Sequence, residues 1–212
     1  VNSINWARIV VQIVYYFFSY YQVAKDGEKL NFSVPTGNFG DIYAGYVAKK
    51  MGLPIHKLFI ATNSNDILKR VINTGVYKPT IVKHTVSPSM DIQVASNFER
   101  LIFDINSCDA KKTLGLMKDL NEKGEFKLDR EQLKKINENF CSESLSEQET
   151  KSVINKMYTN QGVLIDPHTA IAIGIIDKIS SKENIITLAT AHPSKFSDVV
   201  NSETNIKPEL PE

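Results

Sequence analysis

The feature that most constrains this chain is the segment Ser33-Val34-Pro35-Thr36-Gly37-Asn38-Phe39-Gly40-Asp41. An apolar run from Leu30 to Val34 leads into it, and an apolar-periodic stretch from Ile42 to Met51 follows it. This order predicts a strand, a glycine-containing turn and a helix. The glycines permit a tight turn with bare backbone N–H groups, and the helix N-terminus adds partial positive charge. The segment therefore predicts a phosphate-binding loop that needs no basic side chain.

The loop fits neither of the common nucleotide-binding patterns, because the chain contains no G-x-x-x-x-G-K-[ST] and no G-x-G-x-x-G. A tight turn without any ligand is the alternative interpretation. Thr36 and Asn38 place polar side chains beside the N–H groups, which favours a phosphate. The phosphate need not belong to a nucleotide.

Composition excludes several classes of protein. The content of 42% hydrophobic and 23% charged residues is ordinary for a soluble globular protein. A net charge of +1 argues against a nucleic-acid partner. The most apolar stretch, from Ile9 to Tyr21, contains Gln12 and Ser19 and is too short to cross a membrane. Two cysteines without a CxxC pattern or a Cys/His cluster indicate a reducing compartment and no structural zinc, and we expect a cytoplasmic protein.

Hydrophobic periodicity predicts an α/β fold with a parallel sheet flanked by helices. The predicted strands are 30–34, 57–61, 80–85, 163–165 and 185–189. The predicted helices cover 4–21, 41–51, a segment from about 67, a segment from 87 that includes 97–105, and 109–122, 129–138, 146–159 and 166–179. A capping box at Ser146 and Glu149 starts one helix, and Asp166 with Pro167 starts another. The mostly helical stretch at about 80–160 looks like an insertion beside the sheet.

Ligands of open parallel sheets bind at the carboxyl ends of the strands. Residues 36–41 and 190–195 both follow predicted strands, so we expect them to face one site. The Thr190 hydroxyl can bond a heteroaromatic nitrogen without adding charge, although it can equally cap a turn. Arg8 can clamp a phosphate through its guanidinium or simply lie along apolar surface. The four histidines are scattered, and His168 is expected in the first turn of a helix.

Several segments, in this order and spacing, resemble threonine synthase over nearly the whole chain. They are Asn2-Ser3-Ile4-Asn5-Trp6-Ala7-Arg8-Ile9, Val34-Pro35-Thr36-Gly37-Asn38-Phe39-Gly40-Asp41, Ala61-Thr62-Asn63, Asp166-Pro167-His168-Thr169-Ala170 and Thr190-Ala191-His192-Pro193-Ser194-Lys195-Phe196. The Gly-Asn-Phe-Gly and Thr-Ala-His-Pro motifs are specific to the longer branch of that family. The resemblance implies a fold-type II pyridoxal-phosphate (PLP) enzyme of the tryptophan synthase β-like kind. Residues 1–212 would be the C-terminal half of its PLP-binding large domain.

The resemblance also implies a cofactor site and a reaction. Gly37, Asn38, Phe39 and Gly40 would hold the PLP phosphate through backbone N–H groups, and Thr190 would bond the pyridine nitrogen. The family is a carbon–oxygen lyase of threonine biosynthesis that acts on a phosphate ester. It converts O-phospho-L-homoserine and water into L-threonine and phosphate, with PLP as the electron sink.

A second phosphate subsite is required, since the glycine loop would already hold the phosphate of PLP. Asn5 and Arg8 are the candidates for the substrate phosphate, because the Arg fork can hold two oxygens at once. The expected partners are this small-molecule substrate, with no nucleic acid and no membrane. We expect a monomer or a homodimer.

One departure from the family pattern bears on activity. The family's Schiff-base lysine lies in a Ser-Phe-Lys-Asp motif upstream of Asn-Ser-Ile-Asn, and this chain contains no such motif. We therefore expect a fragment without a catalytic lysine of its own, which is inactive in isolation.

Two other functions stay open on the sequence. The first is a non-catalytic, threonine-synthase-like protein that binds PLP or a phosphorylated metabolite. The second is a nucleotide-binding α/β module that uses the same loop. The upstream sequence discriminates the first, and visible absorption on adding PLP to the complete protein would exclude the second.

Overall fold

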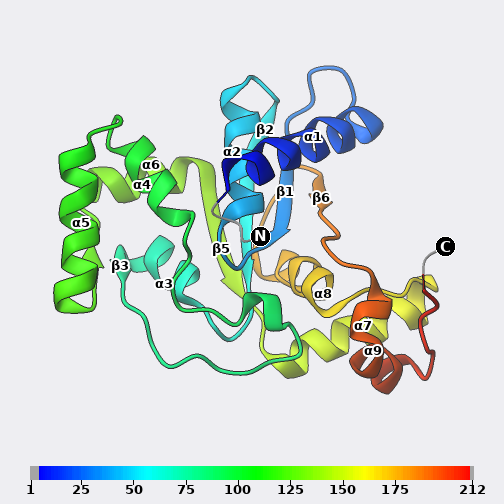
Figure 1. Ribbon diagram of the computed structural model, residues 1–212. Helices are drawn as coiled ribbons and strands as arrows, with labels where there is room; N and C mark the ends of the chain where they lie inside the picture. The colour runs from blue at the N-terminus through cyan, green and yellow to red at the C-terminus, as the bar shows by residue number, and fades with distance from the viewer. Residues whose placement is uncertain (1–4, 211–212) are drawn as a thin grey trace.

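The computed structural model describes residues 5–210 (Figure 1). The expectations for Asn2, Ser3 and Ile4 lie outside these residues. In the described part, the main sheet has four parallel strands in the order β5-β2-β1-β6. They are β1 (Leu30–Pro35), β2 (Ile55–Thr62), β5 (Phe140–Ser144) and β6 (Ile185–Thr187). A small antiparallel pair is formed by β3 (Val76–Tyr77) and β4 (Phe126–Lys127).

Helices make up most of the remaining structure. They are α1 (Trp6–Val23), α2 (Gly40–Lys50), α3 (Ile67–Thr74), α4 (Phe98–Ile105), α5 (Ala110–Lys123), α6 (Arg130–Asn139), α7 (Glu147–Gln161), α8 (Pro167–Gly174) and α9 (Ser197–Thr204), with short 3-10 turns η1 (Pro88–Met90), η2 (Ile176–Lys178) and η3 (Pro193–Phe196). The predicted α/β class is confirmed, as are the capping box of α7 and the Asp166 cap of α8. None of the helices in residues 5–210 is long and apolar enough to cross a membrane.

The alternation of side chains along β2 explains how the sheet is covered on both faces. Leu58 and Ile60 belong to the large core that contains α1 and α2, whereas Phe59 and Ala61 pack with α8. Successive residues of a strand point to opposite faces, so an almost continuous apolar run is what a strand covered on both sides requires. The sheet is thus a middle layer, and its strand ends are the positions open to a ligand.

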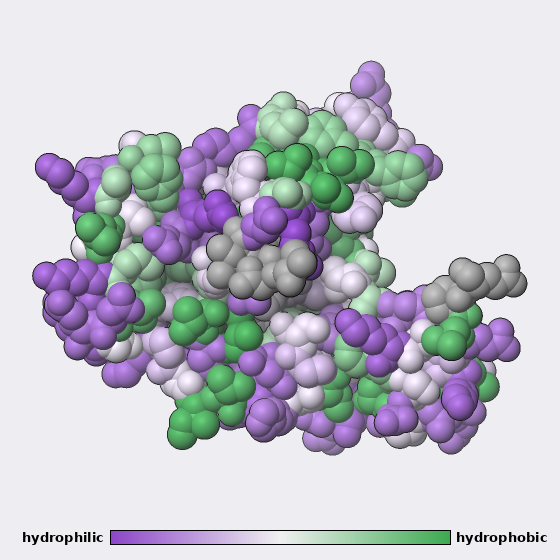
Figure 2. All heavy atoms as spheres, viewed as in Figure 1, coloured by the Kyte–Doolittle hydropathy of each residue, from purple (hydrophilic) through white to green (hydrophobic). Residues whose placement is uncertain are grey.

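Helix α1 packs beside α2, as Figure 1 shows. Its inner face is apolar and buried through Ile9, Ile13, Tyr16 and Tyr20. Its outer face is also apolar, with exposed side chains at Val10, Val11, Val14, Tyr15 and Phe18. Figure 2 shows the resulting hydrophobic surface over this helix.

The stretch 80–160 is not entirely an insertion beside the sheet. Phe140–Ser144 is β5, which pairs in parallel with β2 from Leu58↔Phe140 to Thr62↔Ser144. It forms an edge of the main sheet, so its Phe-Cys-Ser-Glu-Ser sequence needs only a few apolar side chains. The rest of the stretch is mainly helical, as expected.

Two predicted strands are wrong. Residues 80–85 form no strand, because side chains occupy their backbone groups: Asn65 bonds the N–H and the C=O of Lys83, and Asp91 accepts from Thr85 N at 2.8 Å. Residues 163–165 are likewise irregular. Gly162 ends α7 in the left-handed conformation, and the Val163 N–H still turns back to Met157 O.

Candidate functional site

A cavity of about 370 Å³ lies where β1 and β6 end. Residues from five separate parts of the chain line it, and they include both polar loops singled out in the sequence. They are Arg8, Gln12, Pro35, Thr36, Gly37, Asn38, Phe39, Gly40, Asp41, Ser89, Met90, His168, Thr190, Ala191 and Lys195. All the sequence-predicted site residues except Asn5 are therefore brought together.

The loop between β1 and α2 is fixed by its backbone carbonyls, which leaves its N–H groups available. Asn97 donates to Asn38 O from both its backbone N and its Nδ2, at 3.0 Å each. Thr36 N donates to Ala61 O, which ties the loop to β2. Within the described part of the chain, the N–H groups of residues 37–41 donate no hydrogen bond. Such a row of N–H groups at a helix start is suited to an anion.

The side chain of Phe39 anchors the loop between β1 and α2 to the hydrophobic core. Its φ of 65° is left-handed, a conformation that side chains rarely adopt. The ring is buried and packs against Phe98 and Phe140, with centroids 5.2 and 5.7 Å away. The sequence emphasised the glycines, whereas the unusual backbone conformation falls on Phe39.

Gly37 is required by packing inside the protein. A Cβ at this position would lie 2.7 Å from Ser89 O and 3.4 Å from Met90 Cα. Turn η1 therefore packs in direct contact with the loop between β1 and α2. It is held there by Asn63, whose Nδ2 donates to Ser87 Oγ at 2.9 Å and to Asp91 Oδ1 at 2.8 Å.

Asp41 is an acidic group beside the loop. Its Oδ1 is buried without a hydrogen-bond partner among the described residues. Burial raises the pKa of Asp41 from 3.8 to about 6, with a smaller lowering effect from Tyr16. The Tyr16 hydroxyl also donates to the Asp41 backbone oxygen at 2.9 Å. Asp41 thus ionises reluctantly at the place where an anion is expected.

Two cationic side chains line the same cavity from opposite ends of the chain. Arg8 comes from the first turns of α1. Lys195 comes from η3, with its Nζ 5.7 Å from the centroid of the Phe196 ring. Thr190 is exposed and precedes η3. Asn5 instead caps α1, where its Oδ1 accepts from Ala7 N at 2.9 Å.

The sequence did not assign a role to His168 in this cavity. The residue does lie in the first turn of α8, as expected, and it is 3% exposed. Its Nδ1 lies 2.7 Å from Asp166 Oδ2. The only signal in the sequence was the Asp-Pro-His order, which places a helix-capping carboxylate two residues before an imidazole.

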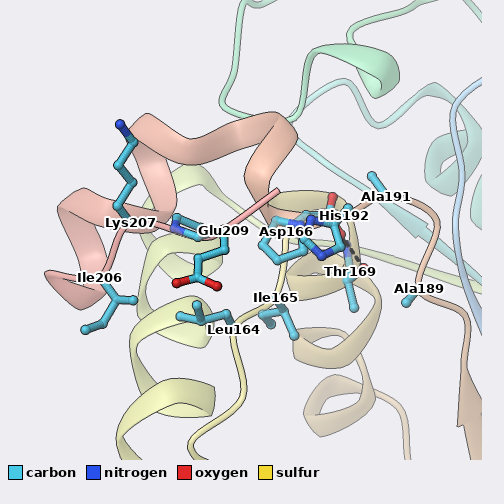
Figure 3. A pocket seen from close by; sticks show the side chains of 12 residues that line it. Leu164, Ile165, Asp166, Thr169, Ala189, Ala191, His192, Ile206, Lys207 and Glu209 are labelled. Atoms are coloured by element: carbon cyan, nitrogen blue, oxygen red, sulfur yellow. Dashed lines mark hydrogen bonds between the residues drawn. The ribbon is translucent and has the colours of Figure 1, made fainter. Parts of the chain in front are cut away.

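A larger cavity, of about 640 Å³, lies next to the first and shares Ala191 with it. Figure 3 shows Asp166 and Thr169 of α8 on one side and Ile206, Lys207 and Glu209 of the C-terminal segment on the other. It contains neither the glycine loop nor Arg8, so we assign the ligand to the smaller cavity. Across residues 5–210, no cluster of three or more His, Cys, Asp or Glu residues is arranged to hold a metal ion.

Comparison with solved structures defines the class of protein. Serine racemase from Dictyostelium discoideum superposes with a TM-score of 0.53 at 15% identity, over 86% of this chain and 48% of that one. At this identity the likeness concerns the fold alone. The chain has the α/β fold of the fold-type II pyridoxal-phosphate enzymes.

More similar proteins share one name. PLP-bound threonine synthase from Brucella melitensis superposes with a TM-score of 0.96 at 47% identity, and the match covers 100% of this chain and 46% of that one. Threonine synthase from Saccharomyces cerevisiae is 44% identical over 95% of this chain and 43% of its own length. Residues 169–212 match the family model "Threonine synthase, C-terminal". The chain is similar over nearly all of its length to these threonine synthases, and it spans less than half of their length.

Proposed function

We propose that this chain is the part of a threonine synthase that binds the phosphate and the ring nitrogen of PLP. The enzyme as a whole would convert O-phospho-L-homoserine and water into L-threonine and phosphate. The observation that carries the proposal is one cavity lined by residues 37–41, whose N–H groups donate no hydrogen bond within the described part of the chain, by Thr190, and by the cationic side chains of Arg8 and Lys195. The similarity to a PLP-bound threonine synthase supports it.

The residues present fit the cofactor. The row of N–H groups beside a helix start suits the PLP phosphate, and Thr190 can bond the pyridine nitrogen without adding charge. When bound, PLP supplies an electron sink for carbanion chemistry. This chain's own contribution is to hold and orient the cofactor, whereas the covalently bound lysine would come from a Ser-Phe-Lys-Asp motif that these residues do not contain.

The substrate phosphate requires a second anion subsite in this proposal. Arg8 and Lys195 line the cavity along with the loop, so either can face a second phosphate. Arg8 is the stronger candidate because its planar fork holds two oxygens. Asn5 would contribute indirectly, by capping the helix that carries Arg8.

We further propose that residues 1–212 are the C-terminal half of the PLP-binding large domain, with the family's helical insertion at about 80–160 interrupted by β5. We expect a monomer or homodimer in the cytoplasm. The two cysteines, Cys108 and Cys141, are both unpaired in the structure, which supports a reducing compartment.

The test is product formation by the full-length protein. PLP and O-phospho-L-homoserine are added, and threonine and inorganic phosphate are quantified against protein without PLP. Equal molar amounts of both products, dependent on PLP, support the proposal. PLP binding without products would favour the non-catalytic alternative, and no PLP binding would exclude both.

A further inference from the structure

We propose that His168, held by Asp166, is an additional phosphate contact of this cavity and donates Nε2–H to a phosphate oxygen. This inference rests on the proposed function for the identity of the ligand. The phosphate belongs either to the cofactor or to the substrate, and the chemistry of recognition is the same for both.

One ring nitrogen of His168, Nδ1, faces a buried carboxylate. Asp166 is fully buried, and its Oδ2 lies 2.7 Å from His168 Nδ1. Burial acts to raise the pKa of Asp166, but hydrogen bonds from His168 and Thr169 outweigh it, so the pKa is lowered. The carboxylate is therefore ionised, and it can only accept. His168 must place a proton on Nδ1.

The other ring nitrogen of His168 is Nε2. His168 Nε2 is buried and has no hydrogen-bond partner among the described residues, although 4% of the side chain is accessible. A buried polar atom left in this state costs free energy, and native proteins rarely retain one without a reason. Since His168 also lines the cavity, a polar group of the ligand is the natural partner for Nε2.

The partner of His168 Nε2 in this proposal is an anion. The cavity contains the anion-binding loop together with Arg8 and Lys195, so a phosphate is the expected occupant. An ionised phosphate oxygen accepts hydrogen bonds, and Nε2 must therefore donate. That requires the imidazolium form, whose charge the Asp166 carboxylate balances from the other side of the ring. Among residues 5–210, Asp41 is the only acid that lines the cavity, and burial raises its pKa to about 6.

The ring is also held in orientation by its surroundings. Phe196 packs against it, with the ring centroids 4.8 Å apart. Asp166 Oδ2 additionally accepts from the His168 backbone N at 2.9 Å. Asp166 thus acts as a positioning residue that fixes both the backbone and the imidazole at the start of α8.

The experiment measures the ring nitrogens of His168 by NMR in the full-length protein, with inorganic phosphate as the probe. PLP-free and PLP-loaded protein are compared. If PLP alone moves the Nε2 signal toward the imidazolium position, His168 contacts the cofactor phosphate. If only added phosphate moves it in the loaded protein, His168 contacts the substrate subsite. Either result supports the inference.

Variants supply an independent reading. In His168→Asn the amide nitrogen can replace Nδ1 toward Asp166, while nothing replaces Nε2. We expect the affinity for inorganic phosphate or for PLP to fall at least about tenfold, as for loss of a charge-assisted hydrogen bond. His168→Gln, whose amide nitrogen can reach the Nε2 position, should restore part of it. His84→Asn is the matched control, because His84 is exposed and lines no described cavity.

Asp166→Asn tests the positioning role. Its amide can donate to Nδ1, so Nδ1 no longer needs a proton and the imidazolium loses its counter-charge. The response of Nε2 to phosphate should then shrink, a readout that a purely structural role would not move.

The inference is overturned if neither PLP nor phosphate moves the Nε2 signal and His168→Asn binds both with wild-type affinity. The wild-type signal decides this even if the variants fail to fold. Because the phosphate titration of PLP-free protein needs no catalysis, it is informative even if no threonine is formed. Failure of the proposed function is thereby distinguished from failure of this contact.

Discussion

Single residues around the cavity differ in how strongly burial affects their chemistry. Thr190 is exposed just before η3, and its hydroxyl is available to a ligand. The ionisation of Asp41, in contrast, depends on burial, which raises the pKa of its carboxyl group to about 6. The two residues therefore call for different measurements.

Replacing Thr190 by Val keeps the shape of the side chain and removes the hydroxyl. If Thr190 bonds the pyridine nitrogen, turnover should fall at least about tenfold, or 1.4 kcal/mol. The visible spectrum of bound PLP should also shift, while thermal stability stays the same. Thr159→Val is the matched control, because the Thr159 hydroxyl only bonds carbonyls of its own helix. Wild-type turnover with an unshifted spectrum would remove Thr190 from the site.

Asp41→Asn should change the dependence of stability on pH. The pKa of Asp41 in the folded protein, about 6, exceeds the ordinary aspartate pKa of 3.8 that applies to the unfolded chain. The folded state therefore binds the proton more tightly than the unfolded chain. Stability from this group is therefore fully present below about pH 4 and is lost as pH rises through about pH 6. The Asp41→Asn variant does not lose stability in this way, because asparagine does not ionise. Urea unfolding of PLP-free full-length protein should show that the stability of the variant relative to wild type increases by about 2–3 kcal/mol between about pH 4 and pH 7. A difference that is constant with pH would contradict the assignment.

At the scale of elements, local signals in the sequence predicted more than long-range contacts did. The β1-α2-β2 unit could be predicted because apolar runs and glycines mark its boundaries. β5 was missed because Phe140–Ser144 is an edge strand with a mostly polar sequence. Residues 80–85 were taken for a strand because no local pattern shows that Asn65 and Asp91 bond their backbone.

The residues of the candidate site also differ in whether local sequence patterns or long-range contacts reveal them. The loop, Thr190 and Arg8 were found from motifs and from their resemblance to a family. His168 was seen only as a helix residue, because its burial depends on Phe196, which lies far along the chain. Likewise, the close contact between Ser89 and Gly37 exists only when η1 is packed against the loop, which no local sequence pattern shows.

Gly37→Val should disrupt the loop as an element. A Cβ would clash with Ser89 O at 2.7 Å, so either η1 or the loop must move. The N–H groups would then lose their common direction, and PLP affinity should drop by at least about 1.4 kcal/mol, or tenfold. A spectroscopic PLP titration checks this, with a thermal unfolding curve to confirm that the variant folds. Unchanged affinity would show that the loop does not hold the cofactor.

The contact between α1 and α2 depends on Gly45. A Cβ there would lie 2.6 Å from Tyr16 Cζ and 2.9 Å from Leu58 Cδ2. Gly45→Ala should therefore destabilise the protein by about 1–3 kcal/mol through overpacking. Gly115→Ala is the control, since nothing lies within 4 Å of its Cβ position and it should stabilise exposed α5 by about 0.5–1 kcal/mol. Equal effects in chemical denaturation would contradict this packing.

At the scale of the whole molecule, the chain corresponds to one part of the threonine synthases to which it is similar. It spans less than half the length of the threonine synthases that it matches. The sheet, the loop and the residues after β6 nevertheless form one cavity within residues 5–210. The central claim is that this cavity receives PLP, with its phosphate on residues 37–41 and its ring nitrogen at Thr190.

The most direct test of that claim is a crystal structure of the full-length protein with PLP. We expect the cofactor phosphate within about 2.7–3.2 Å of backbone nitrogens of residues 37–41, and the pyridine nitrogen at a similar distance from Thr190 Oγ1. A PLP phosphate bound elsewhere, with this loop in contact only with water, would contradict the account.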